Sequence, residues 1–220
     1  MEIVNFEDSY RHKGLRRKLI DELRRKGIRD ERVLNAIDKV PRHLFMDSSF
    51  VEFAYQDKAF PIAAGQTISQ PYTVAFMTEL LNIKPHDKVF EVGTGSGYQT
   101  AILSELGGKV YTIERQKDLF QGCQHLLKML GYNPLYFFGD GYLGKPTYAP
   151  YDKIIVTAGA PEIPQVLVEQ LAVGGRMVIP IGAEDLQVMT TIDKVSSTQV
   201  NVREHGYFVF VPMLKGTNNR

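Results

Sequence analysis

The pattern of apolar and polar positions divides the chain into a helical N-terminal part and an alternating remainder. In the first part, apolar residues recur at intervals of three and four, which predicts an amphipathic helix over about residues 12–26. The apolar face of this helix consists of Leu15, Leu19, Ile20 and Leu23. Gly27 is placed to end it, Asp30 to cap a second short helix, and Pro41 to end that second helix.

From residue 88 onward, short runs rich in β-branched and aromatic residues alternate with stretches of helical spacing. The expected strands are residues 88–93, 109–114, 134–138, 152–158, 175–181, 188–194 and 200–212, and the expected helices are 96–106, 116–130 and 163–171. Strands joined by crossover helices run parallel, with helices on both faces of the sheet. The last two strands, joined by residues 196–199, are expected as an antiparallel hairpin at the sheet edge. The sequence therefore predicts a doubly wound α/β fold with a mostly parallel sheet of about seven strands, preceded by an N-terminal helical segment.

Composition narrows the class of protein. The chain has 220 residues, of which 44% are hydrophobic and 23% charged, as is typical of a folded globular protein. Its net charge of +1 excludes a global field that attracts nucleic acid or anionic lipid. The single cysteine, Cys123, excludes an intramolecular disulfide and a zinc site built on several thiolates. No apolar run approaches the roughly 18 residues of a membrane-spanning helix, and the first residues do not read as a secretory signal, so we expect a cytoplasmic protein.

One local departure from neutrality lies between Arg11 and Arg32, where ten basic residues stand against four acidic ones. We interpret this run as the solvated face of the first helix, because charge runs on amphipathic helices usually face water. A docking surface for an anionic partner is the alternative.

Chemistry is expected where the first parallel strand ends, because ligands of such sheets bind outside the carboxyl ends of the strands. Three glycines follow at alternate positions, Gly93, Gly95 and Gly97, and they permit a tight turn close to a ligand. A dinucleotide fingerprint needs glycine where this chain has Tyr98. The acid before the loop, Glu91, suits a ligand with a cationic end better than a pyrophosphate.

Two further acids end the next two strands. Glu114 lies 21 positions beyond Gly93, where an acid typically accepts hydrogen bonds from the hydroxyls of a ribose. Asp140, between two glycines, can accept from the exocyclic amine of an adenine, and an ordinary Asp-Gly turn is the alternative. The glycine loop and the distant acid together predict a nucleoside cofactor.

These three features, in this order, resemble the class I S-adenosylmethionine-dependent methyltransferases, which are Rossmann-like. A more distinctive stretch precedes them, a glycine-containing loop that leads into a helix over residues 59–77. Ser69 is the expected N-cap of that helix, and Pro71 falls in its first turn. Residues 66–71 (QTISQP) nevertheless look like the signature of the protein-L-isoaspartate O-methyltransferases. The resemblance runs from about residue 10 to 215, and its other supporting segments are residues 40–45, 91–103, 139–141, 154–158, 161–164 and 210–212.

The resemblance implies an enzyme that transfers a methyl group from S-adenosyl-L-methionine to the α-carboxylate of L-isoaspartyl residues, and more weakly to D-aspartyl residues, in damaged proteins. The products would be S-adenosyl-L-homocysteine and a methyl ester that cyclises to a succinimide without the enzyme. The resemblance also implies that Ser69 is the catalytic residue, with Thr67 and Ile68 beside it in the substrate site. The implied cofactor-binding residues are Glu91, Gly93, Thr94, Gly95, Gly97, Glu114, Asp140 and Gly141. From the charge, the cysteine and histidine pattern and the apolar runs, we expect no metal and no nucleic-acid or membrane partner, and we expect a monomer.

The expected organisation is a single domain over residues 1–215. Its parts are an N-terminal helical segment (1–58), an active-site loop and helix (59–82) and a cofactor-binding core (83–215), followed by a flexible tail (216–220). Val74 departs from the family pattern, since some relatives have a histidine there, so that cofactor contact is not carried over.

The residues suit this chemistry. A carboxylate with a pKa near 4 is ionised at neutral pH, so its methylation needs no general base. A hydroxyl at Ser69 can orient that carboxylate by hydrogen bonding and is not expected to act as a nucleophile. The five histidines are scattered, without metal-ligand spacing, and Cys123 falls on the apolar face of a helix, where we expect it to pack rather than react.

Two other functions compete with this interpretation. A methyltransferase for nucleic acid would explain the basic helix, but enzymes that methylate base amino groups usually carry an acid, Asn or Ser before Pro-Pro-aromatic after the fourth strand. This chain has residues 157–161 (TAGAP) there instead. A protein that binds the cofactor without catalysis, and holds a partner through residues 66–72 and the basic helix, is the second alternative.

Overall fold

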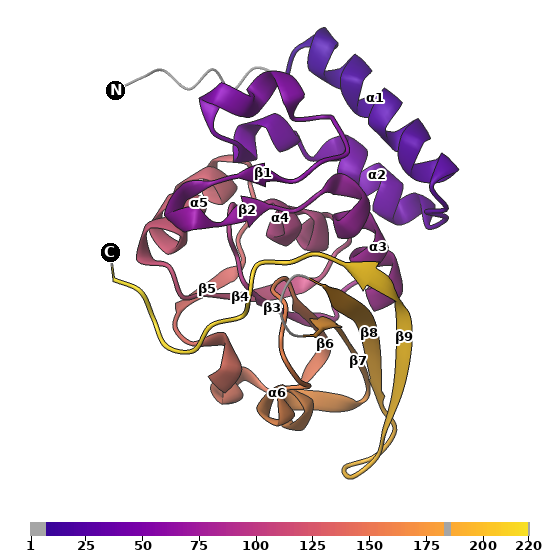
Figure 1. Ribbon diagram of the computed structural model, residues 1–220, viewed down its shortest axis with the longest axis vertical. Helices are drawn as coiled ribbons and strands as arrows, with labels where there is room; N and C mark the ends of the chain where they lie inside the picture. Colours follow the sequence, from indigo (N-terminus) through magenta and orange to yellow (C-terminus); the bar gives the residue numbers. More distant parts are fainter. Residues whose placement is uncertain (1–7, 183–185, 220) are drawn as a thin grey trace.

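A seven-stranded sheet forms the centre of the molecule (Figure 1). The computed structural model describes residues 8–182 and 186–219. The order of the strands is β5-β4-β3-β6-β7-β8-β9, in which β3–β7 run parallel and β8 is antiparallel to both of its neighbours. The strands are β3 Lys88–Val92, β4 Lys109–Glu114, β5 Leu135–Phe138, β6 Tyr151–Val156, β7 Leu171–Ile181, β8 Gln187–Lys194 and β9 Val200–Phe208. The predicted doubly wound sheet and its terminal hairpin are confirmed.

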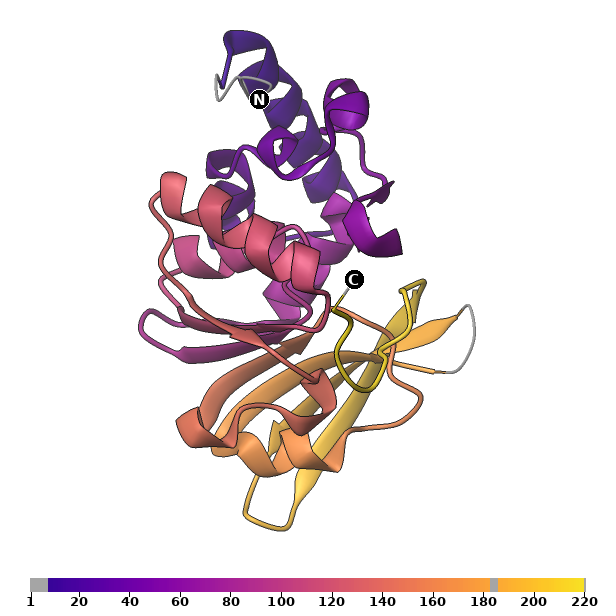
Figure 2. The same cartoon turned by 90° about the vertical axis from the view of Figure 1, so that its left-hand side faces the viewer.

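Helices cover both faces of this sheet. α3 (Pro71–Leu81), α4 (Tyr98–Glu105) and α5 (Lys117–Met129) lie on one face, and α6 (Gln165–Gln170) lies on the other (Figure 2). The packing of core side chains follows the alternation of residues along each strand. Val89 packs with Met77, Leu81 and Leu103, whereas the next residue, Phe90, packs with Tyr151 and Leu167. Consecutive side chains of a strand thus pack against helices on opposite faces of the sheet, as the two-residue period of a strand requires.

The N-terminal segment forms a further layer over α3 and α4 rather than over the sheet (Figures 1 and 2). It contains α1 (Tyr10–Arg25), α2 (Glu31–Lys39) and the 3₁₀ turns η1 (Arg42–Phe45) and η2 (Ser48–Phe53). As predicted, Asp30 caps α2, because its side chain accepts a hydrogen bond from the Arg32 backbone N–H at 2.9 Å.

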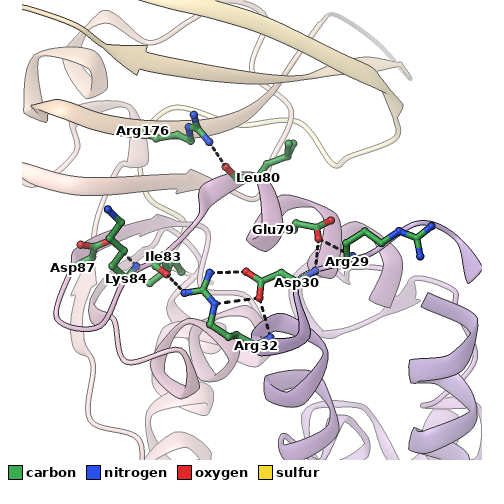
Figure 3. A network of polar contacts seen from close by, with 9 residues as sticks. All are labelled: Arg29, Asp30, Arg32, Glu79, Leu80, Ile83, Lys84, Asp87 and Arg176. Atoms are coloured by element: carbon green, nitrogen blue, oxygen red, sulfur yellow. Dashed lines mark hydrogen bonds and ion pairs between the residues drawn. The ribbon is translucent and has the colours of Figure 1, made fainter. Parts of the chain in front are cut away.

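Specific hydrogen bonds join this segment to α3 (Figure 3). The Glu79 carboxylate on α3 accepts from the backbone N–H groups of Arg29 and Asp30, at 2.7 and 2.6 Å. The Arg32 guanidinium donates to the Ile83 carbonyl at 3.0 Å, just beyond the end of α3. The helix that follows the active-site loop is therefore tied to the N-terminal layer at its far end.

The structure differs from the sequence prediction at the C-terminus. The last strand ends at Phe208 instead of extending to residue 212. Residues 216–220 were expected to form a flexible tail, yet the Gly216 N–H donates to the Asp140 carboxylate at 2.6 Å. Asn218 also pairs with the chain at Gln116, as a short parallel bridge. These hydrogen bonds, which the local sequence does not reveal, hold the segment across the ends of β4 and β5.

Among the described residues, no helix combines the length and the apolar character that crossing a lipid bilayer requires.

Candidate active site

A cavity lies at the carboxyl ends of β3, β4 and β6, where the sequence predicted a ligand. Three segments distant in sequence enclose it: the glycine loop after β3, the hairpin before α3 and the chain after β9. Its lining residues are 66–69, 92–96 and 211–214 together with Val74, Met77, Tyr98, Gln99, Ile113, Glu114, Arg115, Gly141, Thr157 and Ala158.

The glycine loop is held in shape by the acid of the neighbouring strand. One carboxylate oxygen of Glu114 accepts from the Gly95 N–H at 2.9 Å, and the other accepts from the Gln116 N–H at 2.8 Å. Gly93 has a φ of 96°, and a Cβ there would lie 2.4 Å from the Thr157 hydroxyl oxygen. Since each carboxylate oxygen has two lone pairs, Glu114 can accept further hydrogen bonds from a ligand in the cavity.

The structure does not bring Glu91 to this cavity, and the predicted contact with a cationic ligand is corrected here. Glu91 alternates with Phe90 along β3, so its side chain points beneath α4, where it is fully buried. There it accepts a hydrogen bond from the Thr100 hydroxyl at 2.5 Å. Burial raises the pKa of Glu91 to about 8, because the charged form loses its hydration.

Two other residues predicted to bind the cofactor, Gly97 and Asp140, do not line the cavity but lie next to segments that do. Asp140 caps the 3₁₀ turn η4 (Gly141–Leu143) through the Tyr142 N–H at 2.8 Å, and its second oxygen holds Gly216. Gly97 lies against Leu127 of α5, where a Cβ would approach within 2.8 Å. By contrast Gly93, Thr94, Gly95, Glu114 and Gly141 all line the cavity as expected.

A small hairpin carries the predicted substrate residues. β1 (Phe60–Pro61) pairs antiparallel with β2 (Thr67–Ile68), and the Ile62 N–H donates to the Gln66 carbonyl at 2.8 Å. The sequence indicated only a loop here. Ile68 is buried in the N-terminal core and anchors the hairpin, so that residues 66–69 reach the cavity together.

Ser69 is not the N-cap of α3, and this prediction is corrected. Gln70 occupies that position without a capping side chain, and the Asp57 carboxylate instead accepts from the Tyr72 N–H at 2.7 Å. Within residues 8–182 and 186–219, the Ser69 hydroxyl has no hydrogen bond. A half-buried hydroxyl that lines the cavity is therefore available to a ligand.

Comparison with known proteins identifies the family. The family described as Protein-L-isoaspartate(D-aspartate) O-methyltransferase matches residues 14–218. The chain belongs to this family. It is 61% identical to the protein-L-isoaspartate O-methyltransferase of Christiangramia forsetii over 96% of this chain and 100% of the relative. It is 57% identical to the same-named protein of Flavobacterium johnsoniae over equal shares.

A solved structure agrees with this assignment. It is described as a β-aspartate methyltransferase from Plasmodium falciparum in complex with S-adenosyl-L-homocysteine. It is 28% identical to this chain, covers 93% of it and 98% of the solved chain, and superposes with a TM-score of 0.79. As a family member, the present protein is an isoaspartate O-methyltransferase that uses S-adenosyl-L-methionine.

The cavity of this methyltransferase contains groups that suit that cofactor. At one strand end Glu114 offers a carboxylate for hydroxyl groups, and the glycine loop offers closely approachable backbone. Apolar side chains, among them Val92, Ile113 and Met213, supply surface for an adenine ring. Val74 is buried and adds another apolar contact.

Sequence reasoning missed several contributors to the methyltransferase site. Thr157 follows β6 and donates to the Gly93 carbonyl at 2.7 Å, which fixes the start of the glycine loop. Its position directly after a parallel strand was a usable signal. Residues 211–214 close the cavity from the C-terminal side. The family resemblance included residues 210–212, but no local pattern placed this segment at the cavity, because its position depends on the turn of the chain after β9.

The histidines are less scattered in space than in sequence. His12 and His43 stack with ring centroids 3.8 Å apart, and with Asp8 they form a group whose ligand atoms lie within 4.8 Å of one another. Both carboxylate oxygens of Asp8 also accept from the Arg16 guanidinium at 3.0 Å.

Cys123 is buried as predicted, and burial raises the pKa of its thiol to about 12.

Proposed function

We propose that the cavity binds S-adenosyl-L-methionine between the glycine loop and Glu114, and that the hairpin presents an isoaspartyl carboxylate to it through Ser69. One observation carries this proposal: the uncommitted Ser69 hydroxyl lines the same cavity as the glycine loop and Glu114. Thr67 and Ile68, which directly precede Ser69, line the same cavity and would contact the peptide backbone of the substrate.

The bound cofactor supplies an electrophilic methyl group on a sulfonium. The residues around it need only position and desolvate the acceptor, because an isoaspartyl carboxylate is ionised at neutral pH and requires no base. Ser69 donates a hydrogen bond that holds one carboxylate oxygen, which leaves the other directed along the line of transfer. Ile68, Val74 and Met213 exclude water from the reacting groups.

The cofactor roles divide into direct and supporting ones. Glu114 would accept the ribose hydroxyls, while Gly93, Thr94, Gly95 and Gly141 would contact the cofactor along the cavity wall. The roles proposed for Glu91, Gly97 and Asp140 are indirect. They stabilise the loop, the start of α4 and the C-terminal segment that surround the cofactor.

Substrates of this reaction are damaged proteins and peptides that contain isoaspartyl residues, as the family name indicates. The methyl ester would cyclise to a succinimide without the enzyme, and hydrolysis would return some normal aspartate. A cytoplasmic location, a monomeric state, and the lack of nucleic-acid and membrane partners stay predictions from the sequence.

Incubation with S-adenosyl-L-methionine labelled at the methyl group tests the proposal. Two peptides of identical sequence, one with L-isoaspartate and one with normal aspartate, serve as substrate and control. We expect base-labile label on the isoaspartyl peptide alone. Label on both peptides, on nucleic acid, or on neither peptide would contradict the proposed substrate.

A further inference from the structure

The first turn of α3 is capped by a residue far from it in sequence. The Asp57 side chain is only 2% exposed, and one of its oxygens accepts from the Tyr72 N–H at 2.7 Å. Its other oxygen accepts from the Gln70 side-chain amide at 3.0 Å and from the Lys26 ammonium at 2.5 Å. Asp57 thus joins α1, the chain before the hairpin and the start of α3.

A helix N-terminus has backbone N–H groups without intrahelical partners, and Ser is among the residues that satisfy them best. Ser69 directly precedes the N-cap residue Gln70, so without the Asp57 carboxylate its hydroxyl is the serine acceptor nearest in sequence to the Tyr72 N–H. Its hydroxyl would then accept from the helix backbone and turn away from the cavity. The buried Asp57 carboxylate already satisfies one of these N–H groups, which removes that competition.

We propose that Asp57 is a positioning residue for the methyl transfer, because its cap on α3 keeps the Ser69 hydroxyl available to the substrate carboxylate. Lys26 and Gln70 hold the Asp57 carboxylate in place, so the C-terminal end of the basic helix α1 contributes to the order of the active site. This inference rests on the role proposed for Ser69 above.

A matched control is available within the chain. Asp30 also caps a helix, through the Arg32 N–H at 2.9 Å, and also pairs with a cation, the Arg32 guanidinium, at 2.6 Å. Asp30 is outside the cavity lining. Asp30→Ala therefore removes a cap and an ion pair of the same kind without touching the start of α3.

The experiment compares Asp57→Ala, Asp57→Asn and Asp30→Ala with wild type in steady-state methylation of an isoaspartyl peptide. For Asp57→Ala we expect kcat/KM for the peptide to fall about tenfold or more, while KM for S-adenosyl-L-methionine stays within about twofold. Asp57→Asn keeps an acceptor for the Tyr72 N–H and should recover much of the loss. Asp30→Ala should lower the midpoint of thermal unfolding comparably and leave kcat/KM within about twofold.

Two outcomes would overturn the inference: equal kinetic losses in the Asp57 and Asp30 variants, or an unchanged kcat/KM in Asp57→Asn and Asp57→Ala. If Asp57→Ala does not fold, the lower kcat/KM of Asp57→Asn relative to Asp30→Ala decides.

The Ser69→Ala variant separates the role proposed for Asp57 from the role proposed for Ser69. The role of Ser69 fails if Ser69→Ala has wild-type kcat, whereas the role of Asp57 fails if Asp57→Ala still lowers kcat equally in a Ser69→Ala background.

Discussion

Two carboxylates on adjacent strands of this methyltransferase have opposite surroundings. Glu91 pairs in register with Thr112 inside the sheet and is covered by α4, whereas Glu114 ends its strand beside the glycine loop. Both acids point to the same face of the sheet, because Glu91 is in register with Thr112 and Glu114 follows Thr112 by two residues. They differ in position along the strand, since Glu91 lies within β3 and Glu114 is the last residue of β4. We therefore propose that the acid at the end of β4 binds the cofactor, whereas the acid within β3 is held beneath α4 by the Thr100 hydroxyl.

Replacement of Glu114 should weaken cofactor binding. We expect Glu114→Ala to cost about 1–3 kcal/mol in affinity for S-adenosyl-L-methionine, because it removes charge-assisted hydrogen bonds to the ribose and the partner of the Gly95 N–H. Titration calorimetry measures this loss. The exposed Glu204→Ala on β9 is the control and should bind as wild type does. An unchanged affinity in Glu114→Ala would remove the ribose role.

The buried Glu91 should make stability depend on pH. Its pKa is raised from 4.5 to about 8, so between these values the folded chain keeps a proton that the unfolded chain releases. The stabilisation from this protonation is complete below about pH 4.5 and is lost as the pH rises through about 8. Urea unfolding of wild type and Glu91→Gln at about pH 5.5 and 8 isolates this contribution. We expect the variant to lose less stability over that interval; parallel losses would show that Glu91 does not titrate there.

At the scale of elements, the sequence predicted the helices and strands of the core well. The hydrophobic periodicity of these elements is strong. The glycine loop and the capping residue Asp30 mark element ends through local interactions, which a sequence pattern can reveal. The cap of α3 was assigned wrongly because Ser69 and Pro71 form a complete local signal. The cap that forms comes from Asp57, and only the tertiary fold brings that residue there.

The C-terminal segment shows the same limit. The polar run at the end of the chain is typical of a frayed end, yet the Gly216 N–H donates to the Asp140 side-chain carboxylate, and Asn218 makes backbone hydrogen bonds to Arg115 and Lys117. Such bonds leave no mark in local composition, since any residue with an N–H or a carbonyl can make them. The hairpin of β1 and β2 was missed for a related reason, because each of its strands has only two residues.

Across the whole molecule, the basic helix α1 is partly engaged within the fold. Arg16 pairs with Asp8, Arg24 with Glu31, and Lys26 with Asp57. The remaining basic residues, Arg11, Lys13, Arg17, Lys18 and Arg25, are exposed. The solvated face predicted for this helix describes these residues, and the N-terminal layer as a whole packs on the helices beside the cavity (Figure 2).

The central claim is that one cavity holds the methyl donor and the damaged peptide side by side, with Ser69 on the peptide side and Glu114 on the donor side. A crystal structure of the enzyme with S-adenosyl-L-homocysteine and an isoaspartyl peptide tests it most directly. We predict the ribose within hydrogen-bond distance of Glu114 and the isoaspartyl carboxylate within hydrogen-bond distance of the Ser69 hydroxyl. A peptide bound elsewhere, or a Ser69 hydroxyl turned into the first turn of α3, would contradict the account.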